Sequence, residues 1–231
     1  MSTSVCLVFP QQLFEQHPAF AHAQEFWLIE DELFFTKVPF HQKKLALHRA
    51  SMNYYAEYLR SNSKVVRYFE AKEAKLDGVF AQLRQMTNQL IVVDPTDFLL
   101  EKRIRRFAAQ HDLSIHWLNN PSFLNTPADN QRLFGQREER FFMADFYKKQ
   151  RERLGILLES SVQPLGGRWS FDADNRKALP KGLNTPNFPV YQSKWAQAAQ
   201  SFVSTNYPTH PGDPDLSAYP VTHQEAKAAL D

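Results

Sequence analysis

The chain has 231 residues, of which 43% are hydrophobic and 13% aromatic, enough to bury the core of one or two domains. Its formal net charge is only +2, which excludes a global basic field as the means of attracting nucleic acid. A single cysteine, Cys6, excludes a disulfide framework and any all-cysteine metal or iron-sulfur site within this chain, and its apolar neighbours predict a buried thiol.

Five short runs of branched and aromatic residues are separated by helical patterns in the first half of the chain. Such runs are typical of strands buried on both faces of a parallel sheet. They are Val5–Pro10, Glu25–Glu30, Lys64–Glu70, Gln89–Asp94 and Leu113–Leu118. With right-handed crossovers they predict an α/β fold: an open five-stranded parallel Rossmann-like sheet in the order 3-2-1-4-5, with helices on both faces.

The longest helical pattern lies between the second and third runs and predicts a helix from Phe40 to Arg60. Its apolar stripe is formed by Leu45, Met52, Tyr55, Ala56 and Leu59. The polar residues expected to stay largely off that stripe are His41, Lys43, Lys44 and Arg49. Two further crossover helices are indicated by apolar residues around Val79 and around Ile104.

The carboxyl ends of the predicted strands gather polar and turn-forming residues. Ligands of open α/β sheets bind at this edge, near the point where the strand order reverses. The segments Phe9–Gln12, Glu30–Glu32 and Asp94–Phe98 are expected there, and Thr96 or Asp97 can cap the helix that follows the fourth strand. The sequence therefore predicts a ligand site at the carboxyl edge.

The second half of the chain is less regular. A basic amphipathic helix is predicted from Glu138 to Leu154, and eight of the 14 prolines lie between Pro164 and Pro220. We expect a domain over residues 1–155 and a long irregular linker over 156–220, packed on that domain. Residues 221–231 are expected to begin a further, truncated helical domain, because Thr222 and Glu225 form a capping-box pattern without a stop signal after it.

Familiar catalytic and cofactor motifs are absent from the sequence. We find no G-x-G-x-x-G, no phosphate loop, no H-E-x-x-H and no nucleophile elbow, so no catalytic residue and no metal site are predicted. His41 and His48 would share a helix face with Lys44 and could bind an anion, although a solvated face explains them as well. The basic clusters Lys102–Arg106 and Lys148–Arg153 allow DNA contacts or simple solvated helix faces. No stretch reaches about 18 apolar residues, so we expect a soluble, cytoplasmic protein with no membrane contact.

The stretch from Gly166 to Lys181, GGRWSFDADNRKALPK, is too irregular for a helix or strand. Its glycines permit unusual backbone angles, while Trp169 and Phe171 are large side chains that a loop should not leave in water. From the residues alone, the simplest interpretation is a connector whose aromatic side chains dock it on a neighbouring surface. We expect them to lie on this domain or to stay exposed where a partner belongs.

Four segments of the chain resemble one family, the deoxyribodipyrimidine photolyase-related proteins, which are similar to iron-sulfur bacterial cryptochromes and (6-4) photolyases. The segments are LVFPQQL, FHQKKLALHRASMNYYAEYL, MADFYKKQRERLGIL and QPLGGRWSFDADNRKALP, and the last is the most specific. In the first, Gln12 and Leu13 match the family's glycine-aspartate-glutamine-leucine turn, whereas Pro10 and Gln11 depart from it. Phe34 stands where relatives can carry an acidic residue.

The resemblance implies an N-terminal antenna domain that binds a light-harvesting chromophore, 6,7-dimethyl-8-ribityllumazine, and transfers energy to a flavin. FAD, an iron-sulfur cluster and the DNA-lesion pocket would belong to a missing C-terminal helical domain, so DNA contact and lyase activity would need the full-length protein. The implied cofactor-binding residues are Phe9, Pro10, Gln12, Glu30, Phe34, His41, Lys44, Asp94, Pro95 and Phe98. One alternative is an autonomous Rossmann-like nucleotide-binding protein. Another is a structural domain whose pocket has decayed, and the divergent residues Pro10 and Phe34 support it.

Overall fold

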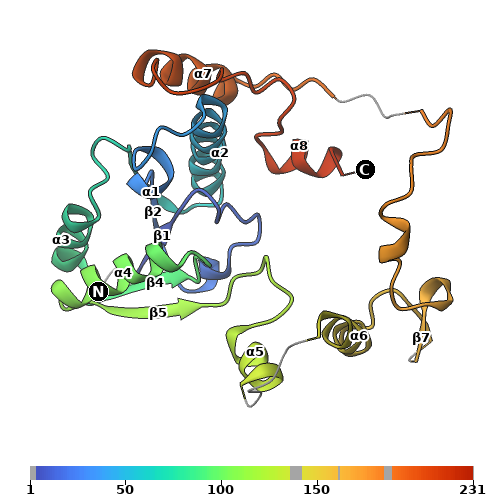
Figure 1. The fold of residues 1–231 in the computed structure, drawn as a ribbon. Helices are drawn as coiled ribbons and strands as arrows, with labels where there is room; N and C mark the ends of the chain where they lie inside the picture. Colours follow the sequence, from blue (N-terminus) through green and yellow to red (C-terminus); the bar gives the residue numbers. More distant parts are fainter. Residues whose placement is uncertain (1–3, 136–141, 161, 185–188, 231) are drawn as a thin grey trace. The chain divides into compact units, whose positions relative to one another are not determined.

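The computed structural model describes residues 4–135, 142–160, 162–184 and 189–230. Its contacts divide the chain into two compact units, the first built from residues 1–126 and 188–231 and the second from residues 127–187. The first unit is therefore discontinuous in sequence (Figure 1). The domain boundaries expected after residues 155 and 220 stay a prediction.

The first unit contains the predicted parallel sheet. Its strands are β1 (Val5–Val8), β2 (Glu25–Ile29), β3 (Val65–Phe69), β4 (Gln89–Val93) and β5 (Ser114–Leu118), and their order is β3-β2-β1-β4-β5. Every pair is parallel, which confirms the predicted topology. The expectation that all five strands are buried on both faces was wrong for β3 and β5, because edge strands have a neighbour on one side only.

Helices cover both faces of this sheet, as predicted. The elements of the first unit besides the sheet are η1 (Pro18–Ala21), α1 (Glu32–Phe35), α2 (Gln42–Ser61), α3 (Leu76–Met86), α4 (Phe98–Gln110), α7 (Lys194–Asn206) and α8 (His223–Ala228). Alternate residues of each strand point to opposite faces. Cys6 and Val8 of β1 therefore join α2 and α7 in one buried cluster, whereas Val5 and Leu7 join α3 and α4 in another.

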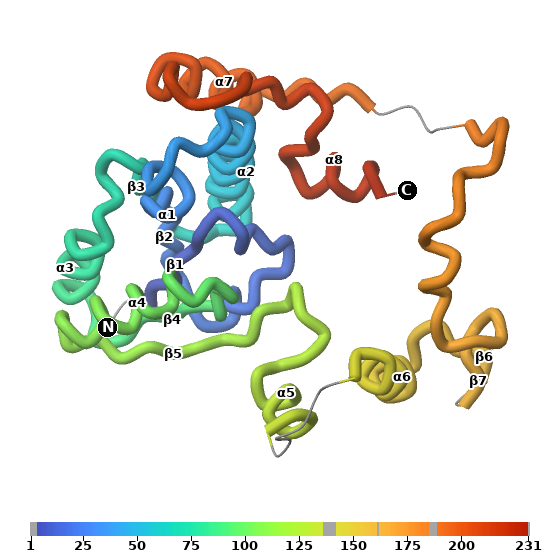
Figure 2. The backbone as a smooth tube through the Cα atoms, in the orientation of Figure 1, coloured from blue at the N-terminus to red at the C-terminus, as the bar shows by residue number. Residues whose placement is uncertain are grey.

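The thirteen-residue helix α7 lies in the stretch where an irregular linker was expected. Ser193 caps it by accepting a hydrogen bond from the Ala196 amide, and Ala196, Ala199 and Val203 bury one side against α2. Figures 1 and 2 show α7 lying across one end of α2. The missed prediction has a physical reason: a stripe made mainly of alanine carries little hydrophobic signal, yet it lets two helices approach closely.

The second unit contains two helices, a short hairpin and the stretch from Gly166 to Lys181, which we call the signature loop. Its elements are α5 (Pro127–Phe134), α6 (Met143–Leu154), β6 (Leu158–Ser160), β7 (Gln163–Pro164), η2 (Leu165–Gly167) and η3 (Asp172–Asp174). The helix predicted from Glu138 is described from Met143, since residues 136–141 lie outside the described residues. Gly155 ends α6 in the left-handed conformation, with φ of 65°.

The signature loop is fastened to α6 within this unit. The buried Arg151 donates hydrogen bonds to the carbonyls of Ile156, Leu157 and Trp169, and its guanidinium lies 5.1 Å from the Trp169 ring centroid. Phe171 remains 42% exposed, and its ring packs so closely on Gly166 (φ 75°) that a Cβ there would come within 3.0 Å of it. Trp169 is thus docked on its own unit, while Phe171 is partly open to solvent.

None of the helices formed by the described residues is long and apolar enough to cross a membrane.

We predict that α7 contributes to the stability of the first unit. Val203 is 1% exposed, so Val203→Ala should lower the free energy of unfolding by about 2 kcal/mol in urea titrations. Val190 is 72% exposed, so Val190→Ala should change it by less than about 0.5 kcal/mol. Equal effects of the two substitutions would contradict the packing of α7 in the core.

Candidate functional site

The loop after β1 is tied to the end of β4 by one buried side chain. Gln12 donates from Nε2 to the Val93 carbonyl at 2.8 Å, and its Oε1 accepts from the Phe9 amide at 3.3 Å. Gln11 Nε2 donates to the Pro95 carbonyl at 3.4 Å. Because β1 and β4 flank the reversal of strand order, these hydrogen bonds fix the two loops where Rossmann-like sheets bind ligands. Of the predicted site, Phe9, Pro10, Gln12 and Pro95 come together here, all buried.

The first loop continues into a segment held by α2 and α8. Tyr55 and Tyr58 of α2 donate their hydroxyls to the carbonyls of Phe14 and Glu15, at 2.8 and 2.7 Å. His223, the first residue of α8, lies 2.8 Å through Nε2 from the Leu13 carbonyl. The capping box predicted at Thr222 is confirmed, and α8 contacts α2 and the first loop through this histidine.

Glu30, at the end of β2, has a fully buried carboxylate. It accepts hydrogen bonds from Arg49 at 2.8 and 3.0 Å, from the Tyr68 hydroxyl at 2.7 Å and from the Ala71 amide at 2.9 Å. Burial raises the pKa of the Glu30 carboxyl, and the positive charge of Arg49 opposes that rise. Glu30 is therefore placed at the carboxyl edge, and its oxygens are engaged within the protein.

Arg49 was expected to lie largely off the buried stripe of its helix, and this was wrong. Its side chain is 10% exposed, bonds Glu70 at 2.6 Å in addition to Glu30, and stacks at 3.5 Å on the ring of Phe202 from α7. A buried, ionised carboxylate needs a partner of opposite charge. Leaving Glu30 unpaired would cost more free energy than burying the guanidinium of Arg49 beside it.

Asp31 was placed at the edge by the sequence but not singled out. Its side chain is fully buried; Oδ1 caps α1 by accepting from the Leu33 amide at 2.9 Å and pairs with Arg103 of α4 at 2.8 Å. Its second oxygen, Oδ2, is buried and has no hydrogen-bond partner among the described residues. Burial raises the pKa of this carboxyl. A buried oxygen without a donor is costly, and the described residues supply no donor for Oδ2.

The segment after β4 turns sharply and starts α4. Asp94 accepts from the Thr96 amide at 2.8 Å, Thr96 adopts a φ of 53°, and Asp97 caps α4 through the Leu100 amide at 2.8 Å. Of the two caps considered, Asp97 is therefore the one used. Asp94 stays half-buried beside the first loop, whereas Phe98 is 74% exposed and contributes no wall to the buried part of the edge.

The remaining predicted residues lie elsewhere in the first unit. Phe34 is half-buried against both core clusters, with its ring 6.3 Å from that of His48. His48 packs among apolar residues, and burial, with a smaller effect of Lys44, lowers its pKa to about 4. His41 instead caps α2, accepting from the Lys43 amide at 3.1 Å. The structure thus separates the two histidines that were expected to share a face.

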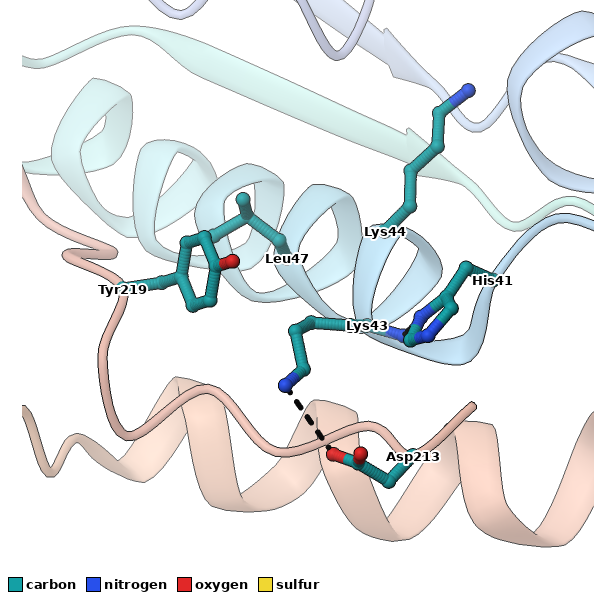
Figure 3. Close-up of a pocket in the computed structure, with 6 residues that line it drawn as sticks. All are labelled: His41, Lys43, Lys44, Leu47, Asp213 and Tyr219. Atoms are coloured by element: carbon teal, nitrogen blue, oxygen red, sulfur yellow. Dashed lines mark hydrogen bonds and ion pairs between the residues drawn. The ribbon is translucent and has the colours of Figure 1, made fainter. Parts of the chain in front are cut away.

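His41 and Lys44 line a separate cavity of about 510 Å³ at the start of α2 (Figure 3). The other lining residues are Lys43, Leu47, Asp213 and Tyr219. Lys43 points toward Asp213 and pairs with it at 3.4 Å, whereas Lys44 points away. Gly212, with φ of 78°, lies so close to His41 that a Cβ would fall within 1.8 Å of its ring. A recess with basic side chains and an aromatic wall can take an anionic ligand.

These features define a Rossmann-like α/β domain with a prearranged carboxyl edge, and comparison with known proteins gives its family. The family model "Deoxyribodipyrimidine photo-lyase-related protein" matches residues 6–219, so the chain belongs to that family and the predicted resemblance is confirmed. An uncharacterised protein of Acanthamoeba polyphaga mimivirus is 30% identical over 191 residues, covering 78% of this chain and 97% of the viral protein. A (6-4) photolyase of Agrobacterium fabrum is 27% identical over 197 residues, covering 82% of this chain but only 38% of the photolyase.

The buried pair of Glu30 and Arg49 should dominate the stability of this edge. Arg49→Met leaves a buried carboxylate without its counter-charge, so the free energy of unfolding should fall by about 3–5 kcal/mol. The double variant with Glu30→Gln should regain part of this loss. Lys194→Met removes the exposed pair with Glu57 and should cost less than about 1 kcal/mol. Urea titrations of the four variants test this, and additive effects of Arg49→Met and Glu30→Gln would contradict the coupling.

A second prediction concerns pH. His17, 2% exposed, accepts from the Ala19 amide at 3.1 Å among Phe14, Phe20 and Phe26, and burial lowers its pKa to about 4. Below about pH 6.5 this histidine binds a proton in the unfolded chain but stays neutral in the folded chain. The free energy of unfolding therefore falls as the pH drops from about 6.5 toward 4. His17→Asn keeps an acceptor for the cap but cannot titrate.

Between pH 7.5 and 4.5, the loss of unfolding free energy should therefore be about 2 kcal/mol smaller for His17→Asn than for the natural protein. His48 contributes equally to both proteins and cancels in the comparison. Identical pH profiles would show that His17 is not held neutral in the folded state.

Proposed function

We propose that this chain is the antenna domain of a cytoplasmic photolyase-related protein. It holds a lumazine-like chromophore at the carboxyl edge of the sheet and passes excitation energy to a flavin bound by another domain. Family membership supports the class of protein. The observation that carries the site is the Asp31 Oδ2 atom, a buried acceptor without a donor among the described residues, in the segment that follows β2.

The residues at the edge fit a heterocycle with a polyhydroxylated chain, such as 6,7-dimethyl-8-ribityllumazine. Asp31 Oδ2, after β2, would accept from a ligand hydroxyl, and Asp94 lies half-buried after β4. Gln12 fixes the loop after β1, the strand that lies between β2 and β4 in the sheet. Pro10 has no amide hydrogen to donate, so recognition would rest on side-chain acceptors more than on the loop backbone. The bound chromophore would absorb light near the visible range. The protein would hold it in place and exclude water from the side that faces the sheet.

The chemistry of DNA repair lies beyond this proposal. The chain spans 38% of the Agrobacterium photolyase that it matches, so FAD, an iron-sulfur cluster and DNA would engage a longer protein or a separate helical partner. Within the part described, we assign no catalytic residue. Light capture and docking are the roles that remain for this chain.

A second candidate is nucleotide binding in the cavity at the start of α2. Its volume of about 510 Å³ falls within the usual range for small-molecule sites, and Lys43 and His41 could attract a phosphate. The pairing of Lys43 with Asp213 reduces this attraction, which is why we rank it second.

Binding of lumazine to the purified chain tests the proposal. Added 6,7-dimethyl-8-ribityllumazine should raise the Tm, since it binds only the folded state, and its fluorescence should give the Kd. Asp31→Asn keeps the helix cap but removes the carboxylate acceptor and should weaken binding at least about tenfold. Asp97→Asn alters the neighbouring helix cap and should leave the Kd unchanged.

The alternatives give different results in the same assay. A chain stabilised by nucleotides and not by lumazine would favour the cavity at the start of α2. A colourless chain stabilised by neither would favour a structural domain without a ligand. Equal weakening by both aspartate variants would contradict a specific contact with Asp31.

A further inference from the structure

A groove of about 420 Å³ lies between α2 and α7, beside the edge strand β3. Two of its lining residues, Ala56 of α2 and Ala198 of α7, are small, so they leave space between the helices open. Tyr68 of β3 and Trp195 of α7 line it with aromatic rings. The volume falls within the usual range for small-molecule sites. None of these residues was assigned to the chromophore site or to the cavity at the start of α2.

The two aromatic side chains of the groove are held by hydrogen bonds. Trp195 Nε1 donates to Glu57 Oε1 at 3.0 Å, and its ring meets the ring of Tyr54 edge to face, with the centroids 5.2 Å apart. Tyr68 donates its hydroxyl to Glu30 at 2.7 Å. Rings that are already fixed offer contact area to a flat ligand at a low cost in conformational entropy.

The charged residues that line the groove do not cancel one another. Lys194 Nζ pairs with Glu57 Oε2 at 2.8 Å, and this hydrogen bond lowers the pKa of the Glu57 carboxyl, which therefore stays ionised near neutral pH. Arg60, in the last turn of α2, also lines the groove and is exposed, and it forms no ion pair within the part of the chain that the structure describes. Two cations and one carboxylate leave the groove with a net positive charge.

The rings and the charge together define the chemistry of a ligand. Tyr68 and Trp195 favour a flat aromatic group, and the guanidinium of Arg60 favours an anionic substituent, because arginine binds carboxylates through paired hydrogen bonds. A second negative charge on the ligand would gain little, since Glu57 repels it. We propose that the groove between α2 and α7 binds a small aromatic ligand with one anionic group, such as an aromatic carboxylate. This site is separate from the chromophore site and does not depend on it.

Titration calorimetry of the full 231-residue chain with 2-naphthoate tests the groove. The probe should bind with a stoichiometry of one. Ala198→Phe places a large ring in the groove and should abolish binding. Arg60→Met removes the positive charge that faces the carboxylate and should weaken binding at least about tenfold. The uncharged analogue 2-naphthalenemethanol should likewise bind the natural chain at least about tenfold more weakly than 2-naphthoate.

A matched control lies next to Ala198 on the same helix. Gln197 is exposed and does not line the groove, so Gln197→Phe adds the same ring outside it and should leave the Kd for 2-naphthoate unchanged. Ala198 is exposed as well, so both phenylalanine variants should keep the Tm of the natural chain. Equal Tm values separate a blocked groove from a misfolded protein.

Two further variants show where the probe binds. Lys43 and Arg60 lie near opposite ends of α2, about 25 Å apart by the rise of an α-helix. Lys43→Met, in the cavity at the start of α2, and Asp31→Asn, at the carboxyl edge, should therefore leave the Kd for 2-naphthoate unchanged. No binding by the natural chain, or equal binding by Ala198→Phe, overturns the groove as a site. Weakening by Lys43→Met or Asp31→Asn, with Arg60→Met unaffected, overturns it too, because the probe would then occupy another site.

Discussion

The first unit depends on a buried charge that must be neutralised. Glu30 closes β2, and its carboxylate draws Arg49 of α2 into the interior, where the guanidinium also bonds Glu70 after β3 and stacks on Phe202 of α7. One ion pair therefore joins two strand ends, the longest helix and a helix from the far end of the chain. Because a buried carboxylate without its partner is strongly unfavourable, these elements have to be in place together. This explains why residues 1–126 and 188–231, which precede and follow the second unit in the sequence, belong to one compact unit.

The same principle orders the candidate site. The pair of Asp31 and Arg103 links the segment after β2 to α4, and Gln12 links the loop after β1 to the end of β4. Polar side chains thus hold the carboxyl edge in shape before any ligand arrives. Asp31 Oδ2 is one of five buried side-chain polar atoms without a hydrogen-bond partner in the described part of the chain, and it is the one that belongs to the segment after β2. Preorganisation of this kind lowers the entropic cost of binding.

Local patterns were enough to predict the strands, the stripe of α2, the capping box and the family. Arg49, α7 and Asp31 were not predictable, for three different reasons. The burial of Arg49 follows from its distant partner Glu30, which a helix pattern does not contain. The stripe of α7 is built from small residues, whose hydrophobic signal is weak. The open oxygen of Asp31 is visible only when its neighbours are in place. Contacts between residues far apart in the sequence, which local patterns do not encode, limited what could be predicted.

The central claim is that the carboxyl edge between β1 and β4 is the chromophore site. The most direct test is a crystal structure of the full chain grown with 6,7-dimethyl-8-ribityllumazine. The account predicts ligand density beside the loop after β1, with a ligand donor within hydrogen-bond distance of Asp31 Oδ2. Density in the cavity formed by His41, Lys43 and Tyr219, with the carboxyl edge unchanged, would contradict it.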